Sequence, residues 1–144
     1  MFQLLRYGRV LLTAALPLHA GAMHVTRVKV IGVPSSAGSV ECALFRDATG
    51  FASKPDKARV LRVPASAGAV ICRSPDSIPA VAAIAVSHAA NRNGRFDQNF
   101  LGIPKEAWGV TRNLRPLMRP PRFEEAAITH ASDADLGLVV ELKP

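Results

Sequence analysis

Hydrophobic and polar residues alternate along much of the chain, which is the pattern of β-strands with one buried face. Between positions 24 and 33, Val28 and Val30 alternate with Arg27 and Lys29. A second alternating run covers Ser39–Arg46, and the turn-forming sequence PSSAG at 34–38 separates the two. Because a short turn between two strands is typical of a β-hairpin, we expect these two strands to pair with each other.

Further short runs predict more strands at Arg59–Val63, Ala69–Cys72, Val81–His88 and Leu136–Leu142. The run Val81–His88 is apolar almost throughout, which predicts a central strand with both faces covered. No stretch of about ten residues has the periodicity of a convincing amphipathic helix. Short strands separated by Pro, Gly and Ser turns therefore predict an all-β fold, a β-sandwich rather than an α/β fold.

The first residues have the three-part pattern of a secretory signal peptide. Arg6 and Arg9 precede the apolar run Val10–Leu18, and the small residues Ala20-Gly21-Ala22 follow it. Since a membrane span takes about 20 apolar residues, this run is too short to be an anchor. We expect a signal peptide at 1–22, a single domain at 23–144, no transmembrane segment after cleavage, and a periplasmic or secreted location.

The chain is basic, with 18 Lys and Arg against 11 Asp and Glu and a net charge of +7. Removing the predicted leader takes two arginines away and leaves 16 − 11 = +5. This charge is spread along the chain and favours loose attraction to anionic envelope polymers or lipid head groups. The expected partner is an envelope protein or polymer; nucleic acid is not expected, since no basic-aromatic recognition motif is present.

The two cysteines, Cys42 and Cys72, both lie in predicted strands of the mature chain. In an oxidising compartment a pair of cysteines in a small domain is usually bridged. Two buried free thiols are the alternative, because the pairing of the strands does not follow from the sequence. The spacing is not C-x-x-C, so a redox-active site is not expected.

A long turn-rich segment follows the apolar run, and its residues resemble a known bacterial family. The residues that carry the resemblance are His88, Asn91-x-Asn93-Gly94-x-x-Asp97-x-Asn99-Phe100-Leu101-Gly102-Ile103-Pro104, Trp108-Gly109, Asn113, Pro120-Pro121 and Phe123-Glu124-x-Ala126-Ala127. The family is domain of unknown function 2141. The resemblance implies a small exported β-sandwich of about seven strands, transthyretin-like (prealbumin-like) in architecture, with a long structured loop and no established activity. This chain departs from the family pattern at Ala89 and at Ala80-Val81-Ala82.

The segment 91–97 is similar to a calcium-binding loop that has lost part of its ligand set. Asn91, Asn93 and Asp97 stand at ligand positions, but Ala89 replaces the leading carboxylate and Phe100 stands where a closing glutamate would be. Calcium needs several oxygen ligands, including more than one carboxylate. We therefore expect no metal and no cofactor, and a set of Asn and Asp side chains that cap backbone amides instead.

The residues that we predict for binding lie between positions 88 and 108, in and around this segment, and are His88, Asn91, Asn93, Asp97, Asn99 and Trp108. Ser87 adjoins His88 but points to the opposite face of a strand, so no nucleophile accompanies a His88–Asp97 pair. The residues favour a non-enzymatic binding or scaffolding module that presents the 89–122 loop. The alternatives are a calcium-stabilised structural module and a hydrolase that uses His88 and Asp97.

Overall fold

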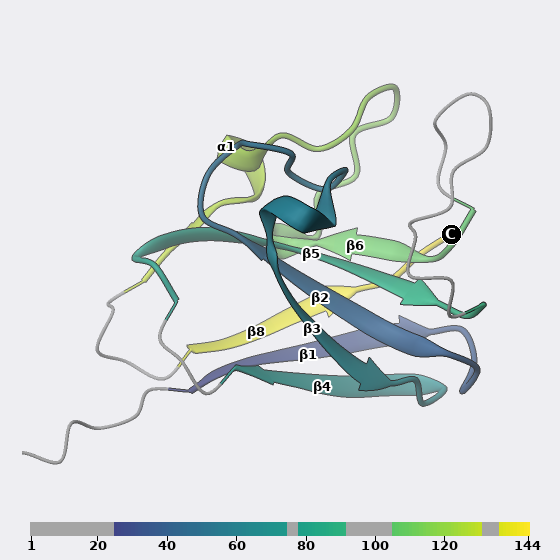
Figure 1. The fold of residues 1–144 in the computed structure, drawn as a ribbon. Helices are drawn as coiled ribbons and strands as arrows, with labels where there is room; N and C mark the ends of the chain where they lie inside the picture. The colour runs from purple at the N-terminus through teal and green to yellow at the C-terminus, as the bar shows by residue number, and fades with distance from the viewer. Residues whose placement is uncertain (1–24, 75–77, 92–104, 131–135) are drawn as a thin grey trace, which may run out of the picture.

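The computed structural model describes residues 25–74, 78–91, 105–130 and 136–144, and within these ranges two β-sheets pack against each other (Figure 1). In chain order the elements are β1 (Thr26–Val33), β2 (Ser39–Phe45), the 3-10 helix η1 (Pro55–Lys57), β3 (Arg59–Pro64), β4 (Gly68–Ser74), β5 (Val81–Ala89), β6 (Trp108–Val110), the 3-10 helix η2 (Thr111–Asn113), α1 (Phe123–Ala126), β7 (Ile128–Thr129) and β8 (Leu136–Glu141). The expected all-β sandwich is confirmed, with eight strands in the described residues where about seven were expected.

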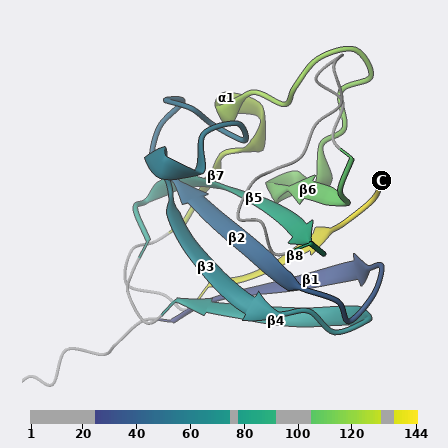
Figure 2. The same ribbon diagram turned by 45° about the vertical axis from the view of Figure 1, so that its right-hand side comes forward.

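The smaller sheet has the strand order β4-β1-β8, and the larger has the order β3-β2-β5-β6, with β7 paired to the start of β5 (Figure 2). The expected hairpin between the first two strands is wrong, because β1 and β2 belong to different sheets. Turn residues at 34–38 specify a reversal of the chain. After such a reversal, two strands that each have one apolar face can either pair side by side in one sheet or pack face to face across a core. Gly38, at a φ of 70°, lies against the backbone of Ala89, which aligns the returning chain with β5.

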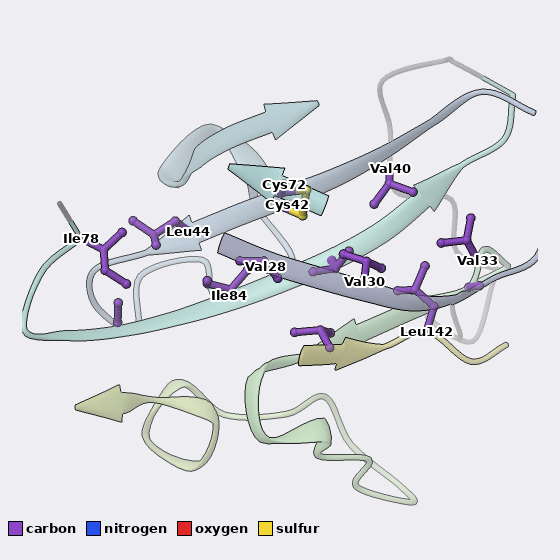
Figure 3. Close-up of a cluster of buried hydrophobic side chains, with 14 residues drawn as sticks. Val28, Val30, Val33, Val40, Cys42, Leu44, Cys72, Ile78, Ile84 and Leu142 are labelled. Carbon is purple, nitrogen blue, oxygen red and sulfur yellow. A yellow bond between two sulfur atoms is a disulfide. The ribbon is translucent and has the colours of Figure 1, made fainter. Parts of the chain in front are cut away.

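The main core lies between the two sheets and is built largely from alternate residues of their strands (Figure 3). Val28 and Val30 of β1 meet Val40 of β2 and Ile84 of β5 there, and all four are buried. Within this core Cys42 of β2 and Cys72 of β4 form the disulfide that the sequence favours. The disulfide joins one sheet to the other. The alternative of two free thiols is therefore not observed among the described cysteines.

The strand β5 is central, as its apolar sequence predicts, because it lies between β2 and β6 in the larger sheet. Ala82, Ile84 and Val86 face the main core, whereas Ala83 belongs to a second apolar cluster on the other face of the sheet. Edge-to-face aromatic contacts hold that second cluster together, with ring centroids 5.2 Å apart for Phe45–Phe51 and 5.8 Å apart for Phe51–Phe123. Both faces of β5 are thus covered over part of its length.

Candidate functional site on the outer face of the larger sheet

His88, the first predicted binding residue, lies in the interior of the sandwich rather than on its surface. The residue is 3% exposed, and its Nε2 lies 2.7 Å from the carbonyl oxygen of Ala37. Because a carbonyl oxygen only accepts hydrogen bonds, Nε2 carries the proton and donates it. The imidazole therefore fastens the 34–38 turn to the end of β5, which is a structural role.

The predicted loop residues are only partly described. Asn91 is exposed in the turn that follows β5. Asn93, Asp97 and Asn99 lie outside the described residues, so the structure does not test the two alternatives that use them, a calcium site and a His88–Asp97 pair. Within the described ranges, no group of three or more His, Cys, Asp or Glu side chains is placed to hold a metal ion.

Four side chains form a line across the outer face of the larger sheet. Arg62 of β3 is paired with Glu41 of β2, Glu41 with Ser87 of β5, and Ser87 with Trp108 of β6. Residues directly opposite each other in antiparallel strands point to the same face of a sheet. The register thus gathers residues from positions 41 to 108 into one continuous line, which we call the outer row.

A hollow opens beside the outer row on the same face. Ala43 and Ala85, which are paired directly, line it between β2 and β5. Its other lining residues include Glu41, Phe45, Ala52, Pro55, Ser87, Trp108 and Val110. The methyl side chains of the two alanines leave this space, which larger residues at those positions would occupy.

The charged members of the outer row are paired with each other. The Nε of Arg62 donates to Oε1 of Glu41 at a distance of 2.6 Å. The Glu41 side chain is only 13% exposed, whereas that of Arg62 is 60% exposed. This pairing holds the carboxylate in a fixed position at the hollow, with the guanidinium on the solvent side.

Arg115 fixes the indole of Trp108. Its guanidinium carbon lies 4.5 Å from the centroid of the indole ring, which is a cation–π contact. The same guanidinium donates to the carbonyl oxygens of Trp108 and Lys143. Partial burial lowers the pKa of Arg115, and the nearby Glu141 carboxylate opposes this shift. Trp108 is therefore a positioned aromatic side chain at the edge of the hollow.

The absence of a side chain at Gly109 lets β8 pass close to β6. A Cβ added at Gly109 would overlap the carbonyl oxygen of Glu141 and crowd the Val140 side chain. The backbones of Trp108 and Lys143 exchange two hydrogen bonds, at 2.9 and 3.1 Å. The motif Trp108-Gly109 thus combines an outward-facing indole with a close contact between strands.

A comparison with protein-family models found a match over residues 28–136 with the family described as "Uncharacterized protein conserved in bacteria (DUF2141)". The chain belongs to this family. The resemblance drawn from the segment around Trp108 is therefore confirmed, and the match to DUF2141 includes all four positions of the outer row. No curated protein and no solved structure matched the chain.

Sequence reasoning identified only Trp108 among the outer-row residues of this DUF2141 chain. Glu41 is the one charged residue inside its strand, SVECALF, and Ser87 interrupts an apolar strand, so each carried a weak signal. Arg62 carried no signal of a site in the sequence, because arginine is common on exposed strand faces. What was missing is the strand pairing, which alone shows that these residues are neighbours.

The described residues that line the hollow form neither of two common catalytic pairs. Ser87 faces the hollow whereas the neighbouring His88 faces the interior, so the two form no nucleophile–base pair. Among the residues described around the hollow, Glu41 is the only carboxylate, and its partner is an arginine. A pair of carboxylates of the kind that glycoside hydrolysis needs is therefore not found among the described lining residues.

Proposed function

We propose that this protein is an exported, non-enzymatic binding module of the cell envelope, and that the outer row and its hollow hold a carbohydrate chain. Export is supported by the predicted leader at 1–22 and by the Cys42–Cys72 disulfide, because structural disulfides are typical of oxidising compartments. In the part of the chain that the structure describes, no helix is long and apolar enough to cross a membrane. The described part of the 89–122 loop supplies Trp108 to the site.

The ligand class follows from the chemistry of the lining residues. A sugar ring has an apolar C–H face and a rim of hydroxyl groups that both donate and accept hydrogen bonds. An indole and the methyl groups of Ala43 and Ala85 suit the apolar face. Carboxylate, guanidinium and hydroxyl groups in one row suit the hydroxyl rim, with Glu41 as acceptor, Arg62 as donor and Ser87 as both.

The observation that carries the proposal is the continuity of the outer row over four adjacent strands. An extended polymer can lie along such a row, whereas an enclosed cavity would suit a small molecule. The central carboxylate disfavours a nucleic acid, whose phosphates it would repel.

The proposal is tested through Trp108, which is the only tryptophan in the chain. Its intrinsic fluorescence therefore reports directly on the hollow. We expect a saturable change on titration with soluble glycan fragments of peptidoglycan or with another bacterial polysaccharide from a panel. Glu41→Gln is expected to weaken binding about tenfold, the usual effect of removing a charged hydrogen-bond acceptor.

Lys29→Gln is the matched control, because Lys29 is exposed on the outer face of the other sheet. Its affinity for the same glycan is expected to equal that of the unmodified protein. The proposal fails if no glycan in the panel changes the Trp108 emission, or if Glu41→Gln and Lys29→Gln bind equally well.

A further inference from the structure

The segment between η2 and α1 projects from the body of the molecule (Figures 1 and 2). It carries two adjacent, exposed apolar side chains. Leu117 is 97% exposed and Met118 is 96% exposed, whereas the next most exposed large apolar residue in the described chain, Val139, is 51% exposed. We call Leu117 and Met118 the tip. Two adjacent large apolar side chains with almost no contacts need an explanation other than the packing of this domain.

The base of the projecting segment is held firmly. The buried hydroxyl of Thr111 donates to the Ala126 carbonyl at 2.7 Å and accepts the Ile84 N–H at 3.2 Å. The side-chain oxygen of Asn113 accepts the backbone N–H of Glu141 at 2.9 Å. These bonds join the segment to β5, α1 and β8.

Both sides of the tip are also held, by arginines. Before the tip, Arg115 is fixed on Trp108 and on the backbone of Lys143. After it, Arg119 forms a bidentate pair with Glu125, with N–O distances of 2.6 and 2.9 Å. The chain is therefore fixed on both sides of the tip, and the exposure of the tip does not come from a fraying chain end.

The charge near the tip is positive. Positions 111–127 contain four arginines (Arg112, Arg115, Arg119 and Arg122) and two glutamates (Glu124 and Glu125), so the net charge is 4 − 2 = +2. Exposed apolar side chains in a projecting segment of net positive charge complement the acyl boundary and the phosphates of an anionic bilayer.

We propose that the tip inserts into the surface of an anionic lipid bilayer, with Leu117 and Met118 in the acyl boundary and the net positive charge of the segment attracted to the lipid phosphates. A protein partner fits less well, because a stable protein interface buries about 800 Å² on each side and two residues on a convex tip supply far less. This inference goes beyond the proposed carbohydrate binding, and neither depends on the other.

The direct test places an environment-sensitive fluorophore on a Met118→Cys variant of the full chain. The native cysteines form the disulfide, so the new thiol is the one that reacts. With vesicles of phosphatidylcholine and phosphatidylglycerol we expect a blue shift of the label, and no shift with phosphatidylcholine alone. The same label on Ile71→Cys, exposed on the smaller sheet, is expected to stay in water in both cases.

A second measurement compares vesicle flotation of Leu117→Ser/Met118→Ser with that of Ile71→Ser/Val139→Ser. The predicted leader is present in both variants, so it contributes equally to both. Loss of the tip is expected to lower the partition coefficient at least about tenfold, and the control is expected to leave it unchanged. Equal partitioning of the two variants would overturn the proposal. A label at position 118 that responds equally to neutral vesicles, or only to rising protein concentration, would also overturn it.

Discussion

At the scale of single residues, Trp108 and Gly109 show how two neighbours in one motif take different roles. The indole of Trp108 lines the hollow, whereas Gly109 lies against the backbone of β8. Successive residues of a strand point to opposite faces, so a substitution at one position tests the site and a substitution at the other tests packing.

Gly109→Ala is predicted to destabilise the fold. The added Cβ would meet the Glu141 carbonyl, a backbone atom that moves only if β8 shifts. We expect a loss of about 1–3 kcal/mol in the free energy of unfolding, measured by urea denaturation. Gly137→Ala is the control, because a Cβ there has no atom within 4 Å, and its effect should stay within about 0.5 kcal/mol. Equal effects of the two substitutions would contradict the packing that we describe.

Glu125 is predicted to titrate well below an ordinary glutamate. Hydrogen bonds from the Arg119 side chain, and then from the Arg122 backbone, lower its pKa from 4.5 to about 2. The unfolded chain therefore binds this proton first as the pH falls. The stabilisation by Glu125 is complete above pH 4.5 and is lost as the pH falls towards 2.

The carboxyl resonance of Glu125, followed by NMR across this pH range, checks that prediction. We expect a midpoint near pH 2 in the unmodified protein and a midpoint closer to 4.5 in Arg119→Gln. Because the pair is exposed, its effect on the melting temperature should be small. A midpoint that does not respond to Arg119→Gln would show that the pair does not persist in solution.

At the scale of elements, the pattern of apolar residues, alternating or continuous, located six strands to within two residues at each end. Each of these strands has one face in the core, so the pattern along the chain reports burial directly. The same pattern missed β6, β7 and α1, which are two to four residues long and too short for a period to show. It also placed β1 and β2 in one hairpin. Whether two successive strands pair in one sheet or pack across the core depends on the other strands with which each of them pairs, and these are distant in the sequence.

The candidate site, like the strand pairing, was only partly predictable from the sequence. Trp108 stood out in the sequence as the single tryptophan of the chain, in a turn-rich segment. Glu41 and Arg62 became site residues only when strand pairing placed them beside Ser87 and Trp108. His88 was predicted for binding from its place at a strand end, but its ring turns inward to Ala37.

At the scale of the whole molecule, two sheets with different outer faces are held together by one core and one disulfide. The outer face of the larger sheet carries the hollow, and that of the smaller sheet carries the exposed cations Arg27, Lys29 and Arg73. The disulfide joins β2 to β4, and thus one sheet to the other.

Reduction of the disulfide is predicted to destabilise the whole domain without changing its fold. Cys42 and Cys72 are 30 residues apart, and closing a loop of this length stabilises by about 3–4 kcal/mol in the chain-entropy model. Urea denaturation of the oxidised and the reduced protein measures this difference while the atoms of the core stay nearly the same. Equal stabilities would show that the covalent link contributes nothing beyond the packing of the sheets.

The central claim is that a carbohydrate chain lies on the outer row, and chemical-shift mapping by NMR tests it most directly. On addition of the glycan that changes the Trp108 emission, we predict the largest shifts at Glu41, Ser87 and the single indole N–H, with no shift at Lys29 or Ile71. An indole signal that stays in place while residues of the smaller sheet shift would contradict the account.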